Sequence, residues 1–170
     1  MTPEFSRRFD IRALPSGPLK LEANPNECAA LAERIGIEAV ERLAAEVTLL
    51  PADGAIEASG RIDATVVQLC AISNEPFTLR ISEPLALRFV EANPSHSTDE
   101  ETEIEIDSET CDEIPYVGTH FDLGEEIAQS LALTIDPYAT GPDADRVRTE
   151  TGLSDEASSG PFAALAALRK

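Results

Sequence analysis

Between residues 38 and 91, apolar and polar residues alternate in three successive runs, and two turn signals separate the runs. Alternation with a period of two is typical of strands that bury one face. The first turn contains Asp53-Gly54, one of the strongest hairpin signals, and the second covers residues 73–76. The segment therefore predicts an antiparallel meander. Pro84 should lie at an edge or a bulge, because proline cannot donate a hydrogen bond to a neighbouring strand.

Two shorter strands are predicted before the meander, at residues 5–11 and 18–22. In the first, Phe5, Phe9 and Ile11 fall on one face.

A helix is predicted to begin after Asn24, which can cap it, with Pro25 in the first helical position. Glu27 lies where it can complete a capping box, and Gly36 can close the helix in the left-handed conformation. Apolar residues at helical spacing include Cys28, which we interpret as a small core residue.

A second helix is predicted to begin after Asp122, with Glu125 at the third helical position. It should end at Asp136-Pro137, because the residue before proline avoids the helical region. Its apolar stripe comprises Leu123, Ile127, Leu131 and Ile135, widened by Ala128 and Leu133.

Residues 91–113 contain ten acidic residues and no Lys or Arg, which predicts a solvated, mobile loop. Within it, residues 103–107 alternate and could pair briefly as an edge strand. Residues 138–160 are rich in Pro, Gly, Ser, Thr and Asp, which predicts a flexible linker. A short helical pattern follows in residues 161–170. Because so short a helix is unstable alone, it either docks on the body or folds on a partner.

These patterns predict an α+β fold: an antiparallel meander sheet of four to six strands with two packed helices, followed by a flexible linker and a short C-terminal helix. The strand number and the Gly and Pro breaks would allow the sheet to curl into a partial barrel. We expect one domain over residues 1–137.

The formal net charge of −19 argues against direct binding to a nucleic-acid backbone, which depends on Lys and Arg. The three cysteines, Cys28, Cys70 and Cys111, lie far apart, and the sequence shows neither a secretory signal nor a membrane-spanning run. We therefore expect a cytoplasmic protein with reduced thiols and no membrane partner.

The sequence contains no motif that indicates catalysis, a metal or a cofactor. It has no Cys/His pairs at zinc-binding spacing, no phosphate-binding loop and no nucleophile elbow. We predict a non-catalytic binding protein. An unsupported alternative is a metal- or thiol-dependent enzyme that uses Cys70 or Cys111.

Three segments resemble the YceD family, the large ribosomal RNA subunit accumulation proteins. They are residues 60–70 (GRIDATVVQLC) with 75–77 (EPF), residues 121–138 (FDLGEEIAQSLALTIDPY) and residues 161–168 (PFAALAAL). The positions that carry the first two resemblances are Gly60, Cys70, Pro76, Phe77, Asp122, Leu123, Gly124, Glu125 and Pro137.

The resemblance implies a bacterial cytosolic protein that supports large-subunit ribosomal RNA levels in ribosome assembly. It implies no catalytic residues. Many family members carry a Cys-x-x-Cys pair at the hairpin, suspected of binding metal or nucleic acid. Here Cys70 occupies the first position, but Ser73 occupies the second, and residues 136–139 lack a second pair. One thiolate cannot make a zinc site.

We expect the partner to be a basic ribosomal protein or assembly factor, with any contact to ribosomal RNA indirect. The candidate partner-binding residues are Pro161, Phe162, Leu165 and Leu168 in the terminal motif and Glu103, Glu105 and Asp107 in the acidic segment. The alternative is direct RNA binding through arginines clustered on the sheet, namely Arg7, Arg8, Arg61, Arg80 and Arg88.

Overall fold

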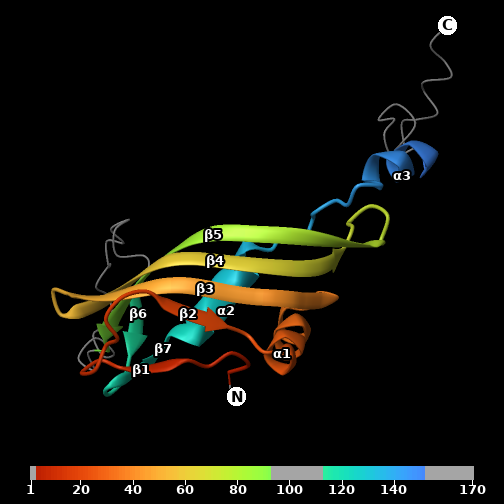
Figure 1. The fold of residues 1–170 in the computed structure, drawn as a ribbon. Coiled ribbons are helices and arrows are strands. Elements are labelled where there is room, and N and C mark those ends of the chain that lie inside the picture. The colour runs from red at the N-terminus through yellow and green to blue at the C-terminus, as the bar shows by residue number, and fades with distance from the viewer. Residues whose placement is uncertain (1–2, 93–112, 152–170) are drawn as a thin grey trace, which may run out of the picture.

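The computed structural model describes residues 3–92 and 113–151. Three long antiparallel strands dominate it (Figure 1). These are β3 (Ala39–Ala52), β4 (Ala55–Leu69) and β5 (Pro76–Glu91), and together they form the predicted meander. The β3–β4 turn places Asp53 at φ 40° and Gly54 at φ 78°, the left-handed pair that a two-residue hairpin turn requires.

The five-stranded sheet has the order β2-β3-β4-β5-β6. Strand β2 (Leu19–Glu22) pairs antiparallel with β3, whereas β6 (Glu113–Tyr116) pairs in parallel with residues 88–91 of β5. The sheet stays open, so it does not form the partial barrel that the sequence allowed. Among the described residues, Pro84 lies where β5 is paired only on the β4 side, as expected for a strand edge.

A second, two-stranded sheet pairs β1 (Arg8–Asp10) with β7 (His120–Asp122). Strand β1 occupies the end of the run predicted at residues 5–11. The Phe121 ring joins the two sheets, because its centroid lies 4.3 Å from that of Phe89 and 6.0 Å from that of Phe9.

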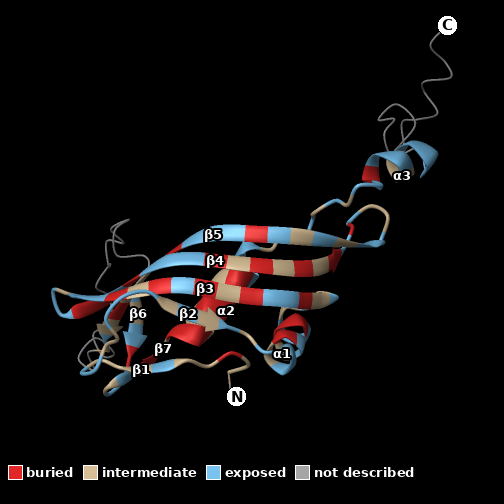
Figure 2. Cartoon of the chain, viewed as in Figure 1, coloured by how far each residue is buried: buried red, intermediate tan, exposed pale blue. Residues whose placement is uncertain are grey.

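Helices α1 (Pro25–Ile35) and α2 (Leu123–Thr134) pack against one face of the large sheet, and the core lies between (Figures 1 and 2). The caps are those predicted: the Asn24 side chain accepts from the N–H of Asn26 and Glu27, and Gly36 closes α1 in the left-handed conformation. Helix α2 begins after Asp122. Its buried residues include Leu123, Ile127, Ala128 and Leu131.

Leu133 departs from its predicted place in that apolar stripe, since it is 88% exposed. Leu133 lies two residues after the buried Leu131, so on an α-helix it points about 200° away from it, toward solvent.

Helix α3 (Ala144–Thr151) forms within the segment predicted as a linker and lies beyond the β4–β5 turn (Figure 1). Ion pairs along the chain stabilise it, because Arg146 contacts both Asp143 and Glu150. The division into domain and linker stays a prediction. None of the helices in residues 3–92 and 113–151 is long and apolar enough to cross a membrane.

Candidate functional site

The residues that carry the first two family resemblances, from Gly60 to Pro137, lie in three places in the fold. Gly60 lies in the middle of β4, where a Cβ atom would come within 2.0 Å of the Glu46 carbonyl oxygen on β3. Only glycine allows that close approach of two strands. Gly60 is therefore explained by packing rather than by binding.

The second group is a junction at the start of α2. The Asp122 carboxylate accepts hydrogen bonds from the N–H groups of Gly124 and Glu125, which caps the helix. It also accepts from the Arg7 N–H at 2.7 Å and from the Ser6 hydroxyl, so one side chain ties the N-terminal arm, residues 3–10, to α2.

The three residues that follow Asp122 also help to pack the start of α2 against the rest of the fold. Leu123 is fully buried. A Cβ atom at Gly124 would lie 2.4 Å from the Phe5 carbonyl oxygen, so glycine lets the N-terminal arm reach the helix. Glu125 pairs through both oxygens with Arg34 of α1, at 2.7 and 3.0 Å. The Arg34 guanidinium lowers the pKa of the Glu125 carboxyl.

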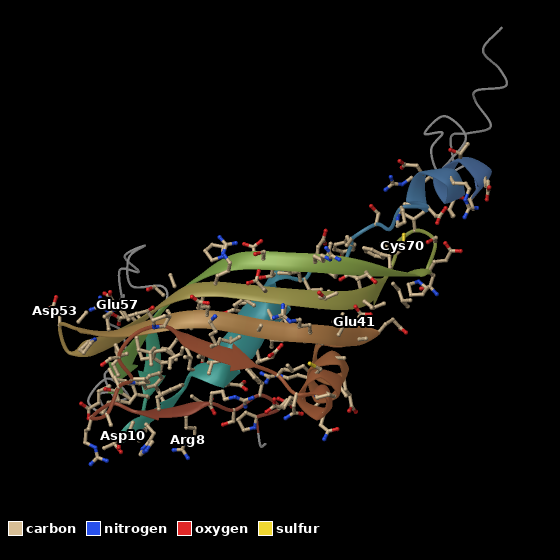
Figure 3. The ribbon with its side chains drawn as sticks, viewed as in Figure 1. Arg8, Asp10, Glu41, Asp53, Glu57 and Cys70 are labelled. Carbon is tan, nitrogen blue, oxygen red and sulfur yellow. The ribbon has the colours of Figure 1, made fainter. Side chains whose placement is uncertain are left out.

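The third group lies at the end of the sheet that Cys70 marks in Figure 3. Residues 70–75 turn from β4 to β5 there, and the chain that follows α2 crosses beside the turn. The Ala71 N–H donates to the Ala139 carbonyl at 3.0 Å, and Gly141 lies against the Phe77 ring. The structure therefore brings Cys70, Pro76 and Phe77 close to the segment that begins at Pro137.

Cys70 is only 3% exposed, yet it lies outside the main core. Its Sγ accepts from the N–H groups of Ile72 and Ser73, each at 3.4 Å. Hydrogen bonds from the Ser73 hydroxyl and N–H lower the pKa of the Cys70 thiol to about 7, against a smaller opposing effect of burial. The pKa of the other described cysteine, Cys28, is shifted in the opposite direction: burial raises it.

Ser73 thus has a role in this turn that its sequence position alone did not indicate: it donates to the sulfur of Cys70. Among the described residues, no group of three or more His, Cys, Asp or Glu side chains could hold a metal ion.

A cavity of about 460 Å³ adjoins this end of the sheet. It lies between the C-terminus of α1, the end of β4 and the C-terminus of α2. Gln68 lines it and is itself only 4% exposed. The Gln68 Nε2 donates to the Asp136 carbonyl at 3.1 Å, whereas its Oε1 accepts no hydrogen bond from the described residues.

Sequence reasoning missed Gln68, although a signal was present. Gln68 follows Ile62, Ala64 and Val66 at a period of two, so it is a polar residue at a core-facing position of the strand. A buried polar side chain in such a position needs a partner, which makes it a site candidate.

The candidate partner-binding residues of the acidic segment and the terminal motif lie outside the described residues. These are Glu103, Glu105, Asp107, Pro161, Phe162, Leu165 and Leu168. Their role stays a prediction.

Replacing Asp122 by alanine should lower the free energy of unfolding by about 2–3 kcal/mol, because the helix loses its cap and the Arg7 N–H loses its partner. Asp122→Asn, which can still cap, should cost about 1 kcal/mol or less. Denaturant unfolding measures both, with Glu33→Ala on the exposed surface of α1 as the control. Equal losses for Asp122→Ala and Glu33→Ala would contradict the junction described above.

The Cys70 thiol should titrate near pH 7 in a variant that keeps it as the only cysteine, followed by the ultraviolet absorbance of the thiolate. Ser73→Ala should raise that pKa toward the ordinary value of about 8.5, because the hydroxyl donor is lost. Since the folded-state pKa is the lower one, ionisation of Cys70 stabilises the fold increasingly as pH rises from about 7 to 9. An unchanged pKa in Ser73→Ala would show that the hydroxyl has no such role.

The family model described as large ribosomal RNA subunit accumulation protein YceD matches residues 58–169. Comparison with curated proteins and with solved structures gives no match. The matched range includes Gly60, the Cys70 turn and the Asp122 end of α2, and it spans more than half of the chain. The chain therefore belongs to the YceD family.

Proposed function

We propose that this protein supports the accumulation of large-subunit ribosomal RNA as a non-catalytic factor that binds a basic ribosomal or assembly protein. The observation that carries the ribosomal role is the match of residues 58–169 to the YceD family, whose name states that role. The class of the partner is argued from charge.

Of the five arginines that an RNA-binding sheet would need, three already have polar partners within the chain. Arg7 forms a two-pronged ion pair with Glu27, at 2.8 and 2.9 Å, and its guanidinium lies 4.3 Å from the centre of the Phe5 ring. Arg88 lies between Glu57 and Glu113, at 3.8 and 3.4 Å. Guanidinium groups held by carboxylates are poorly placed to displace counterions from a phosphate backbone.

The other three arginines of that hypothesis are divided between the two sheets. Arg61 is exposed but donates to Ser82, and it lies opposite Glu46 in the sheet. Arg8 lies on β1 in the small sheet, whereas Arg80 lies on β5 in the large one. This distribution favours a protein partner over direct contact with RNA.

A basic partner fits the net charge of −19, because opposite charge accelerates encounter and helps select the partner. The density of acids is greatest in residues 91–113, so we assign the electrostatic contact to Glu103, Glu105 and Asp107 and their neighbours. An apolar anchor would supply specificity, and the terminal motif with Phe162, Leu165 and Leu168 is our candidate for it.

Binding of the full chain to purified basic ribosomal proteins should weaken about tenfold or more when salt rises from about 0.05 to 0.5 M. Isothermal calorimetry with the full chain measures this. Replacing Glu103, Glu105 and Asp107 by their amides should weaken binding at low salt and flatten the salt dependence.

The matched control is a triple variant that combines Glu33→Gln, Glu41→Gln and Glu83→Gln. It removes the same amount of charge from exposed positions elsewhere. It should have a clearly smaller effect. Tight binding to pure large-subunit ribosomal RNA, with none to ribosomal proteins, would exclude the proposed partner class and favour direct RNA binding.

A further inference from the structure

The Gln68 cavity contains an unpaired hydrogen-bond acceptor. Gln68 Oε1 is buried and accepts nothing from the described residues, and the amide orientation is fixed because Nε2 already donates to the Asp136 carbonyl. Glu38, which is exposed at the rim, supplies the only charged side chain of the lining within residues 3–92 and 113–151. A buried acceptor without a donor is destabilising, so a donor that reaches Oε1 from the cavity gains by satisfying it.

Two helices end at the same cavity and add to its negative potential. Ile35 and Gly36 close α1 there, and Ala132 and Ile135 lie at the end of α2. The last turn of a helix carries unpaired carbonyl groups and about half a negative charge. Helix α2 has no basic residue in its last turn, and Arg34 of α1 is already held by Glu4 and Glu125.

The rest of the lining is apolar. It comprises Ile35, Ile37, Leu69, Ala132, Ile135 and Pro137. Such a cavity suits a ligand with an apolar stem and a cationic head that carries several donors. Arginine meets this description best, because its guanidinium has five N–H donors and is more weakly hydrated than an ammonium group. The volume of about 460 Å³ lies within the range usual for ligand pockets.

We propose that the Gln68 cavity binds an arginine side chain presented by the basic protein partner. The guanidinium would donate to Gln68 Oε1 and to the helix-terminal carbonyls, with Glu38 adding its charge at the rim. The inference rests on the proposed function and deepens it by assigning a specific contact. Nucleic acid is disfavoured as the occupant, because its phosphates would face acceptors and a carboxylate.

The test is nuclear magnetic resonance of the full, ¹⁵N-labelled chain titrated with N-acetylarginine amide. We expect saturable shifts of the Gln68 side-chain amide and of the backbone N–H groups of Gly36 and Ile37. N-acetylcitrulline amide has nearly the same shape without the charge, and it should give no saturable shifts there.

Glu38→Gln should raise the dissociation constant of the arginine compound about threefold, because one nearby charge is lost. Glu41→Gln is the matched control: Glu41 lies three residues further along, near the start of β3, and is exposed, but it does not line the cavity (Figure 3). It should leave the dissociation constant unchanged. Both replacements are at exposed positions, so loss of folding should not obscure the comparison.

Three outcomes would overturn the inference: equal shifts from the citrulline compound, equal effects of the two glutamate variants, or no response at Gln68. Tighter binding of spermidine at the same resonances would reassign the cavity to a polyamine. If arginine fails to bind while ribosomal proteins still bind with strong salt dependence, only this inference is lost. If arginine binds and no ribosomal protein does, the proposed function is lost and the site remains.

Discussion

The hydrogen bonds of the Asp122 carboxylate are the contact on which the arrangement of this fold most depends. One side chain caps α2 and holds the N-terminal arm through Arg7 and Ser6. The arm in turn buries Phe5 completely and sends the Arg7 guanidinium to Glu27 at the start of α1. Both helices are thereby fixed relative to each other on one face of the sheet, and their C-termini come together at the Gln68 cavity.

Charged side chains near the Asp122 junction differ from those in the rest of the chain. Near the junction, arginines are paired with carboxylates, as in the contacts of Arg7 with Glu27 and of Arg34 with Glu125. These pairs hold elements together and leave few cations free. The proposed function assigns the remaining excess of acids to contact with a basic partner. The chain thus combines membership of a family named for ribosomal RNA accumulation with a net charge of −19, and this combination is the reason for proposing a basic protein as the partner.

Short sequence signals predicted the elements that depend on interactions within a few residues of the chain. Asn24, Asp122 and Gly36 act within one turn of a helix, and Asp53-Gly54 acts within one hairpin, so the sequence alone indicated them. Strands β6 and β7 were not predicted, because each is three or four residues long and is paired with residues distant in the chain. Pairings of that kind leave no periodicity to detect.

The site was harder to predict than the fold for the same reason. The low pKa of Cys70 depends on donors that the turn aims at its sulfur, and the cavity depends on two helices that end together. The cavity is a consequence of tertiary packing, whereas the donors to Cys70 come from the same turn, two and three residues away, and depend on its backbone geometry. Gln68 is the exception, since a glutamine at a core-facing position of an apolar strand was visible in the sequence.

The most direct test of the account is the ratio of large- to small-subunit ribosomal RNA in cells whose own copy of the gene is replaced by variants. The account predicts that neutralising Glu103, Glu105 and Asp107 lowers this ratio toward that of a deletion strain. The matched variant with Glu33→Gln, Glu41→Gln and Glu83→Gln should keep it near the wild-type value, at equal protein levels. A wild-type ratio with the first variant would contradict the claim that this protein supports ribosomal RNA by binding a basic partner through its acidic segment.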